Sequence, residues 1–254
     1  MLQYLRRARR IAKSEGLKAL VKKSIVYLDL KTGLLSFLIV LYMRSLKRRL
    51  VSIGDVLNLC FGNAFIFELI KPSQVKEEIC ALLRLLKNLK PGVILEIGTA
   101  RGGTLFLWTY IASNDATIIS IDLPGGPFGG GYPALRKFLY KSFAREKQKI
   151  FLIRGDSHDP ETLNKVKKIL GNELIDFLFI DGDHTYEGVK KDFEMYGSLV
   201  RKGGIIAFHD IVPHPPERGC EVSKFWNEIK HGYRHYEIVK DWSQKWAGIG
   251  VLYV

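Results

Sequence analysis

Cysteine is scarce in this sequence of 254 residues, and its three cysteines form no recognisable pattern. Cys60, Cys80 and Cys220 lie far apart, are odd in number and include no CxxC pair. Such spacing supports neither a disulfide framework nor a zinc knuckle. Because a free cysteine behaves as a small hydrophobe, we interpret all three as buried or incidental thiols and expect a reducing, cytoplasmic location.

The sequence also lacks an apolar run of the length that spans a bilayer. The run at residues 34–43, LLSFLIVLYM, has ten residues, whereas a spanning helix needs roughly twenty. Arg44 and the KRR at 47–49 follow this run directly, which argues against a cleaved signal peptide. We expect the run to pack on the main domain or on a partner subunit, with insertion into a membrane interface as the alternative.

Acidic residues are almost missing from the first fifty positions. The formal net charge is +13, and residues 1–50 hold thirteen Lys/Arg against only Glu15 and Asp29. The rest of the chain carries 26 basic and 24 acidic side chains, so nucleic-acid binding by the main domain is not predicted. Apolar residues at helical spacing among the cations of residues 2–25 predict a basic amphipathic helix. This segment is a candidate for peripheral contact with an anionic membrane, or for an assembly arm.

Beyond these absences, apolar runs alternate regularly with helix-like segments. The expected strands are residues 93–97, 117–121, 150–153, 175–180 and 205–208. The expected helices lie between and after them, at residues 104–113, 134–147, 160–170, 186–200 and 222–231. Strands buried on both faces read as continuous apolar runs, and this alternation implies parallel strands with right-handed crossovers. Two strand-like runs end the chain without a long helical period between them. We therefore predict an α/β fold with a doubly wound, mostly parallel seven-stranded sheet and a closing antiparallel hairpin.

Two regions are expected along the chain. Residues 1–72 are predicted to form a basic helical N-terminal extension, and residues 73–254 the α/β domain. The domain begins with an amphipathic helix after Pro72, for which Ser73 is the expected N-cap. Lys90-Pro91-Gly92 ends that helix.

Ligands of a doubly wound sheet bind beyond the carboxyl ends of its strands, so polar residues at those ends are candidate site residues. The first strand ends in LEIGTARGGT, where Gly98, Gly102 and Gly103 allow a tight turn and a close backbone approach to a ligand. The G-x-x-x-G-G spacing is neither the dinucleotide motif nor the Walker motif. Glu96 puts a carboxylate where a phosphate cradle avoids one, which favours a ligand with a cationic or hydroxyl-bearing part.

The next two strand ends carry acids as well. Asp122 ends the second strand, where a carboxylate is placed to accept hydrogen bonds from ribose hydroxyls. Asp156 and Ser157 follow the third strand and can bond the edge of a base. Helix capping is the alternative role for Ser157 and Asp159.

The segment EIGTARGG resembles the glycine-rich first motif of the class I S-adenosylmethionine-dependent methyltransferases. The resemblance covers about residues 75–254 and implies a Rossmann-like fold with S-adenosylmethionine as cofactor. It implies that the glycine loop holds the methionine portion, Asp122 the ribose, and Asp156 with Ser157 the adenine. The implied cofactor contacts are Glu96, Gly98, Thr99, Gly102, Gly103, Asp122, Asp156, Ser157 and Asp181.

The later segments LFIDGDHTYEGVKKDFE and GGIIAFHD resemble one branch of that class, which includes macrolide-sugar O-methyltransferases and cephalosporin hydroxylase-like proteins. Some members bind a divalent metal such as Mg or Mn through an acid that ends the fourth strand and two residues that end the fifth. Matched residue by residue, these ligands are Asp181, His209 and Asp210. The histidine that serves as general base in the sugar enzymes matches His184.

The residues agree with this assignment in outline. Asp181, Asp183 and His184 leave one predicted strand end and His209 and Asp210 leave its neighbour, so all five can converge. A neutral imidazole accepts protons near pH 7. Helix capping and backbone hydrogen bonding are the alternative roles. His209 stands where the family often has an acid, which favours Mn, Fe or Zn over Mg and leaves open a metal-free enzyme in which His184 or His209 acts alone.

Two loops are expected to cover this site. Residues 123–133 contain five glycines and form either a mobile lid or a rigid set of turns. Residues 211–220 offer His214 and Arg218 as contacts for a methyl acceptor, with a solvent-exposed loop histidine as the favoured interpretation of His214.

We therefore predict an S-adenosylmethionine-dependent O-methyltransferase that acts on a small-molecule or sugar hydroxyl, with divalent-metal assistance as an option. A nicotinamide-dependent oxidoreductase would use the same strand ends, but the glycine spacing disfavours it. A non-catalytic membrane- or nucleic-acid-associated module would explain the N-terminal cations, but it has no use for the clustered His and Asp residues. Homo-oligomerisation through residues 34–43 is a further option.

Overall fold

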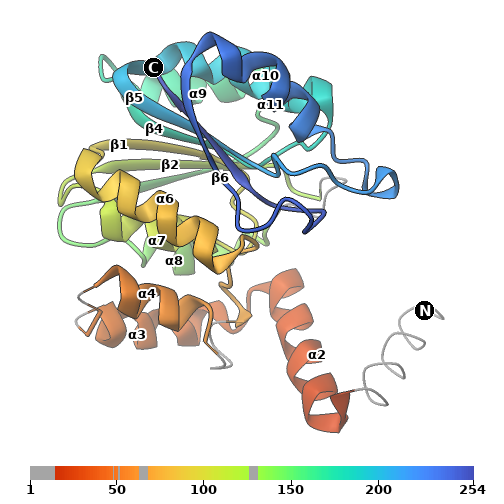
Figure 1. The fold of residues 1–254 in the computed structure, drawn as a ribbon. Coiled ribbons are helices and arrows are strands. Elements are labelled where there is room, and N and C mark those ends of the chain that lie inside the picture. Colours follow the sequence, from red (N-terminus) through yellow and green to blue (C-terminus); the bar gives the residue numbers. More distant parts are fainter. Residues whose placement is uncertain (1–14, 48, 51, 63–67, 126–130) are drawn as a thin grey trace.

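The strands form one sheet whose order and directions are those of a doubly wound α/β fold. The structure is a computed structural model that describes residues 15–47, 49–50, 52–62, 68–125 and 131–254. The strands are β1 (Val93–Ile97), β2 (Thr117–Asp122), β3 (Lys149–Arg154), β4 (Ile175–Ile180), β5 (Val200–His209), β6 (Arg234–Ile238) and β7 (Ile249–Tyr253). They lie in the order β3-β2-β1-β4-β5-β7-β6 (Figure 1), with β1 to β5 parallel and β7 antiparallel to β5 and β6. The predicted seven-stranded sheet with its closing hairpin is confirmed.

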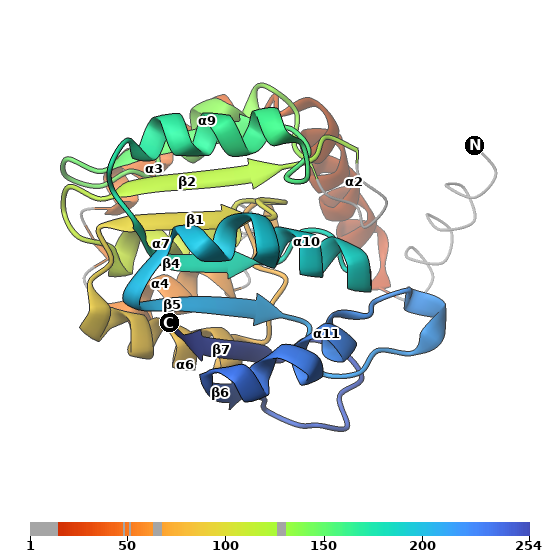
Figure 2. The ribbon, with the colours of Figure 1, turned by 90° about the horizontal axis from the view of Figure 1, so that it is seen from above.

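Helices cover both faces of this sheet and give three layers (Figures 1 and 2). One face carries α6 (Lys76–Leu89), α7 (Gly103–Ile111) and α8 (Arg136–Lys141), and the other carries α9 (Pro160–Leu170), α10 (Tyr186–Tyr196) and α11 (Val222–Ile229). The helices that follow the adjacent strands β1 and β4 lie on opposite faces. The chain therefore changes direction between these strands, which is the point where ligands of such sheets bind.

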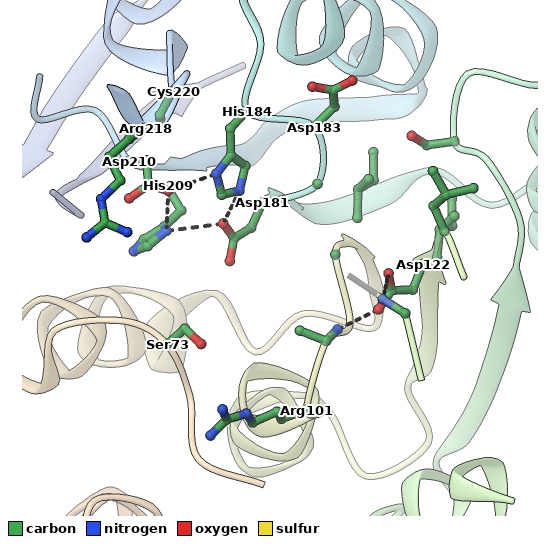
Figure 3. Close-up of a pocket in the computed structure, with 18 of the residues that line it drawn as sticks. Ser73, Arg101, Asp122, Asp181, Asp183, His184, His209, Asp210, Arg218 and Cys220 are labelled. Atoms are coloured by element: carbon green, nitrogen blue, oxygen red, sulfur yellow. Dashed lines mark hydrogen bonds and ion pairs between the residues drawn. The ribbon is translucent and has the colours of Figure 1, made fainter. Parts of the chain in front are cut away.

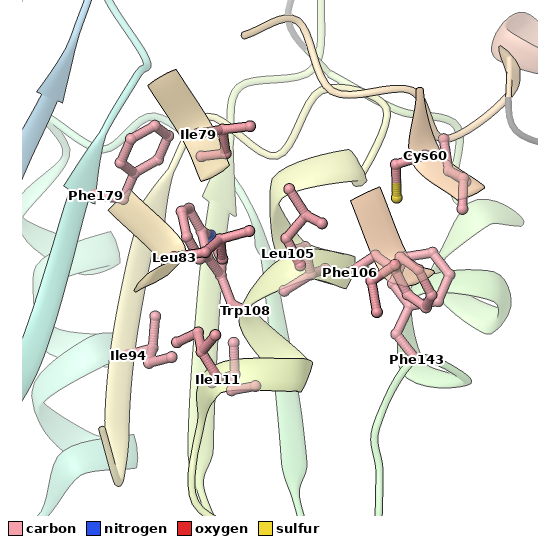
Figure 4. Close-up of a cluster of buried hydrophobic side chains, with 14 of the residues drawn as sticks. Cys60, Ile79, Leu83, Ile94, Leu105, Phe106, Trp108, Ile111, Phe143 and Phe179 are labelled. Carbon is pink, nitrogen blue, oxygen red and sulfur yellow. The ribbon is translucent and has the colours of Figure 1, made fainter. Parts of the chain in front are cut away.

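The largest aromatic side chain of the core links α7 to the sheet. Trp108 is fully buried, and its ring meets the edges of Phe177 and Phe179 of β4 at centroid distances of 5.1 and 5.2 Å. Ile79 and Leu83 of α6 pack against the same cluster (Figure 4), which places the apolar face of α6 against α7 and the sheet. This packing fixes α7, which begins directly after the glycine loop, against the sheet.

The cysteines of the core agree with the prediction in part. Cys60 lies fully buried beside the α7 side of this cluster (Figure 4), and burial raises the pKa of its thiol to about 12. Cys80 is half-buried on α6, and all three cysteines are free. Cys220 is not incidental, because it lines the cavity described below.

The N-terminal helices pack on the α/β domain and share its core. They are α2 (Leu17–Thr32), α3 (Ser36–Lys47) and α4 (Ile53–Cys60). Ile39 and Met43 of α3 are buried in the cluster that also contains Phe106, so the expectation that residues 34–43 pack on the main domain is confirmed. Within the described part of the chain, no helix is long and apolar enough to cross a membrane. Residues 1–14 of the predicted amphipathic helix lie outside the described residues, and the boundary at residue 72 stays a prediction.

A buried ion pair ties α2 to α8. The Asp29 carboxylate lies 2.6 Å from the Arg136 guanidinium, and both side chains are fully buried. Asp29 also accepts a hydrogen bond from the backbone amide of Leu35, and Arg136 donates to the carbonyl of Leu69 and the hydroxyl of Tyr140. Both charges are therefore satisfied by partners from distant parts of the chain.

Several local predictions differ from the structure. The helix expected over 186–200 ends at Tyr196 and is followed by a short 3₁₀ helix at Gly197–Leu199. Ser73 does not cap α6, which begins at Lys76 with Val75 at the N-cap and no side-chain cap. The helix expected over 134–147 ends at Lys141, and the chain turns through Glu146, whose φ is +46°. The strand β5 begins at Val200 rather than at 205, because a shift in its register against β4 lets it continue through Gly203 and Gly204.

Candidate active site

The carboxyl ends of the parallel strands surround a cavity of about 960 Å³ (Figure 3). Its walls come from the loops that follow β1 to β5, with additions from α2 and from the loop between β6 and β7. The predicted site residues that line it are Gly98, Asp122, Asp156, Ser157, Asp181, Asp183, His184, His209, Asp210, His214 and Arg218. The topology therefore brings together most of the residues that the sequence singled out.

The glycine loop is shaped by a close approach of β1 to β4. Gly98 has a φ of +100°, and a Cβ at this position would lie 2.0 Å from the carbonyl oxygen of Asp181. Only glycine fits this position without moving the end of β4. Ala100 and Arg101 follow it on the cavity wall.

Four residues assigned to the cofactor do not line the cavity, and their assignment stays a prediction. Glu96 is fully buried and accepts hydrogen bonds from Trp108 Nε1 at 2.8 Å and Ser120 Oγ at 2.7 Å. The hydroxyl of Thr99 is buried against that of Ser120. A Cβ at Gly102 would lie 2.6 Å from the Tyr140 ring, and a Cβ at Gly103 would lie 2.4 Å from the nitrogen of Pro72. These residues shape the loop from below.

Burial governs the charge of Glu96. Desolvation raises the pKa of this carboxyl to about 7, although hydrogen bonds from Thr104, Ser120 and Trp108 oppose the rise. The group is thus poised between its neutral and charged forms near neutral pH.

Asp122 lies at the end of β2 with both carboxylate oxygens oriented by backbone amides. Ala100 N donates to Oδ2 at 2.6 Å and Gly131 N donates to Oδ1 at 2.8 Å. Burial raises the pKa of Asp122 to about 6, against the effect of these hydrogen bonds. The side chain is therefore held in one orientation on the cavity wall.

The third strand end contributes Asp156, Ser157 and His158, all on the cavity wall. The Asp156 side chain is 51% exposed, which leaves its carboxylate open to a ligand. His158 Nε2 lies 3.2 Å from the fully buried carboxylate of Asp192, which fixes the imidazole at this end of the cavity. Asp159 is the N-cap of α9, as the alternative role for it predicted.

Two histidines lie between two carboxylates at the ends of β4 and β5 (Figure 3). His209 Nδ1 is 3.1 Å from Asp181 Oδ1 and 3.4 Å from Asp210 Oδ2. His184 spans the same pair, with Nε2 3.6 Å from Asp181 Oδ1 and Nδ1 3.5 Å from Asp210 Oδ2. Asp210 has a φ of +65°, a backbone conformation that aspartate seldom adopts and that is often found at functional sites.

The charges of this cluster depend on one another. Burial lowers the pKa of both imidazoles, but the carboxylates of Asp181 and Asp210 outweigh it. The pKa of His184 is raised to about 10, with hydrogen bonding to Cys220 contributing, and that of His209 is raised well above its usual value. The neighbouring positive charge in turn keeps the pKa of Asp181 and Asp210 low despite their burial.

The donor atoms of this cluster fit a divalent cation. Those of Asp181, His209 and Asp210 lie within 4.8 Å of one another, and so do those of His184, Asp210 and Cys220. His209 Nε2 is buried and has no hydrogen-bond partner among the described residues. The imidazole nitrogen of His209 beside the two carboxylates suits Mn, Fe or Zn better than Mg.

Several site residues come from elements that motif analysis does not connect to the strand ends. Gln74 Nε2, on the segment before α6, donates to Asp181 Oδ2 at 2.8 Å. The backbone amide of Ala247 donates to Asp210 Oδ1 at 2.9 Å, and Tyr27 of α2 lines the cavity. In the sequence, only the polar side chain of Gln74 and the aromatic side chain of Tyr27 could have indicated a role at the site. The backbone amide of Ala247 gives no such indication, because the fold alone brings it there.

The structure describes the two loops that were predicted to cover the site to different extents. His214 is not a solvent-exposed histidine: its side chain is only 11% exposed, and Nε2 lies 3.0 Å from Asp210 Oδ1. Arg218 lies at the exposed rim of the cavity. In the glycine-rich loop, Leu123 and Gly131 line the cavity, and residues 126–130 lie outside the described part.

The sheet order, the glycine loop at its switch point and the acidic strand ends define the class I methyltransferase fold. Residues 95–211 match the family model described as Methyltransferase domain, which places the match on the part of the sheet that builds this cavity.

Solved O-methyltransferases share this fold. The O-methyltransferase of Bacillus cereus, in complex with SAH, matches with a TM-score of 0.53 at 16% identity, and the match covers 80% of this chain and 90% of the Bacillus chain. The O-methyltransferase TomG from Streptomyces achromogenes, in complex with SAM, matches with a TM-score of 0.52 at 16% identity, and the match covers 80% of this chain and 88% of TomG. An uncharacterized protein of Acanthamoeba polyphaga mimivirus is 36% identical over 140 residues, which are 54% of this chain and 61% of that protein. The chain thus spans about three fifths of that relative.

Proposed function

We propose that the protein transfers the methyl group of S-adenosylmethionine to a hydroxyl group of a small molecule or sugar. The observation that carries this proposal is the histidine and aspartate cluster at the ends of β4 and β5, which lies in the same cavity as the acids of β2 and β3. One end of the cavity suits a nucleoside, and the other suits proton removal from an acceptor. The cavity volume is sufficient for both ligands.

The chemistry of the walls fits this cofactor better than a dinucleotide. Asp122 and Asp156 offer acceptors to ribose hydroxyls and to an adenine amino group, and Ser157 and His158 border the same end. Asp181 and Gly98 lie between that end and the histidine cluster, where a sulfonium centre would meet negative charge. A pyrophosphate would be repelled by these carboxylates, which disfavours the nicotinamide-dependent alternative.

In the proposed mechanism, S-adenosylmethionine supplies an electrophilic methyl group. The acceptor oxygen forms the new bond to that methyl group in line with the sulfur, which keeps the electron pair of the broken bond. His184 in its neutral form takes the hydroxyl proton on one ring nitrogen, while the carboxylate of Asp181 or Asp210 holds the N–H of the other. The Gln74 side-chain amide donates to the second oxygen of Asp181 and keeps that carboxylate in one orientation.

A divalent metal is part of the proposal as an option. Asp181, His209 and Asp210 would hold it, and it would supply positive charge next to the acceptor oxygen and favour the unprotonated form of the neighbouring imidazole. Without such an ion, the two carboxylates favour protonated histidines. We therefore expect turnover to fall on EDTA treatment and to return with Mn²⁺ or Zn²⁺; unchanged turnover would remove the metal from the mechanism.

Calorimetry with the intact protein tests the cofactor. We expect S-adenosylmethionine and its demethylated product to bind with similar affinity and NAD not to bind. The absence of binding by S-adenosylmethionine would overturn the proposed function.

Substitution of His184 tests the catalytic role. We expect His184→Ala to keep the calorimetric affinity for S-adenosylmethionine and to lower release of the demethylated product, measured with a panel of hydroxyl acceptors, by roughly 10²–10⁴-fold. The matched control is His231→Ala, which removes an exposed histidine outside the cavity. Equal turnover in both variants would contradict the role of His184.

A further inference from the structure

Exposed apolar and aromatic side chains lie on two elements that also contribute to the cavity wall, α2 and the loop between β6 and β7. We propose that this surface, made by α2 and the loop between β6 and β7, docks on an anionic membrane, with the cavity mouth at the lipid interface. We call it the rim surface and define it by Leu17, Val21, Ile25, Leu28, Trp242 and Trp246. The docking rests on surface features alone and stands independently of the proposed methyl transfer.

The apolar part of the rim surface is a stripe along α2. Leu17, Val21, Ile25 and Leu28 are 71%, 50%, 37% and 56% exposed. Their spacing of four, four and three residues places them on one face of the helix. A helix that faced only water would carry polar residues there, so this stripe is suited to an apolar environment.

Two exposed tryptophans lie in the loop between β6 and β7, the second element of the rim surface. Trp242 and Trp246 are 55% and 44% exposed, whereas Trp108 and Trp226 are buried. Trp246 lines the cavity together with Tyr27 of α2, so both elements border the same opening. Exposed tryptophan is favoured at the boundary between lipid chains and headgroups.

Charge selects the occupant of the rim surface. Residues 1–50 carry a net charge of +11, and the first fourteen residues contribute five cations and no acid. Anionic lipid attracts such a segment, whereas a second copy with the same charge would be repelled. Nucleic acid would also be attracted, but it has no use for an exposed aliphatic stripe. An anionic membrane satisfies both the charge and the apolar face.

Vesicle binding by the full chain tests the proposal. Cosedimentation is measured with phosphatidylcholine vesicles with and without phosphatidylglycerol, at low and high salt. The variant Val21→Ser/Leu28→Ser removes apolar surface from the stripe. Its matched control is Leu174→Ser, which removes a 50% exposed leucine from the opposite edge of the sheet, just before β4. Both sets of side chains are exposed, and circular dichroism verifies that the variants fold.

We expect the wild type to bind only to the anionic vesicles, and high salt to weaken that binding. Binding should fall about tenfold or more in Val21→Ser/Leu28→Ser, the stripe variant, and should be unchanged in Leu174→Ser. Phospholipids brominated in their acyl chains should quench the tryptophan emission of the wild type, and Trp242→Phe/Trp246→Phe should lose most of that quenching. The second result reports that the cavity mouth meets the lipid.

Three outcomes would overturn the proposal. The first is equal binding to neutral and anionic vesicles, or none; the second is wild-type binding by the stripe variant. The third is a dimer or an RNA complex in sedimentation velocity that disappears in the stripe variant, which would assign the surface to a second copy or to nucleic acid. Calorimetry with S-adenosylmethionine is run on each variant without vesicles, so a failure of docking is distinguished from a failure of the proposed function.

Discussion

At the scale of single residues, the proposed contact between Asp122 and the cofactor predicts that cofactor binding depends on pH. Its carboxylate is oriented by Ala100 and Gly131, and burial raises its pKa to about 6. The charged form is the better acceptor for ribose hydroxyls, and it is lost as pH falls through that value. We expect the calorimetric Kd for S-adenosylmethionine to rise roughly tenfold for each pH unit below about 6.

Asp122→Asn provides the control for this prediction. It keeps the size of the side chain but does not titrate, so its Kd should be higher and should depend little on pH over the same interval. An equal slope in both proteins would assign the pH dependence to another group, such as His158.

Glu96 provides a second pH effect, on stability instead of binding. Its pKa is about 7 in the folded protein, above the ordinary value of 4.5 that it has in the unfolded chain, so the native state binds the extra proton. The free energy of unfolding therefore falls as pH rises through this interval, by about 3 kcal/mol at most. Glu96→Gln keeps acceptors and donors for Trp108 and Ser120 and does not titrate. Urea unfolding should show a steeper loss of stability with pH in the wild type than in this variant, and parallel curves would refute the assignment.

At the scale of elements, the buried pair of Asp29 and Arg136 fixes α2 to α8. Asp29→Ala leaves a buried guanidinium without its carboxylate, and we expect it to lower the free energy of unfolding by about 3–5 kcal/mol. Glu15→Ala breaks the Lys23–Glu15 pair, whose side chains are 51% and 45% exposed, and should cost less than about 1 kcal/mol. Urea denaturation measures both, and similar losses would mean that the buried pair does not hold the helix.

Elements with a strong local signal were predictable from the sequence. The apolar run of β4 and the helix α9, with Asp159 and Pro160 at its start, were predicted with the observed bounds, because burial and capping act over a few residues. The end of α8 and the start of β5 were not, since they depend on contacts across the sheet. Ser73 is a cap by type, but Val75 takes that position and Ser73 lines the cavity instead.

The site was predictable to the extent that strand ends define it. Asp122, Asp181 and Asp210 follow apolar runs, so topology alone brings them to one edge. Gln74 and Tyr27 were not predictable, because their positions depend on how α2 and the start of α6 pack on the sheet. The burial of Glu96 was not predictable either, since the motif gives its place in the chain and not the direction of its side chain.

At the scale of the whole molecule, the basic segment and the α/β domain are separate in charge but not in packing. Residues 1–50 hold most of the net positive charge, yet Ile39 and Met43 belong to the same buried cluster as Phe106 of α7. Lys47 of α3 also donates hydrogen bonds to the carbonyls of Ser142 and Ala144. Removing the basic segment therefore removes part of the core along with the charge.

Two truncations separate these contributions. Deletion of residues 1–50 exposes the surface covered by α2 and α3 and leaves Arg136 without Asp29. We expect a loss on the order of 5 kcal/mol, comparable with the whole stability of a domain, and hence loss of calorimetric S-adenosylmethionine binding. Deletion of residues 1–14 removes five cations and none of the buried contacts described above, so its Tm and cofactor affinity should stay near those of the full chain. A stable, cofactor-binding protein that lacks residues 1–50 would show instead that the N-terminal helices are an appendage whose packing contributes little.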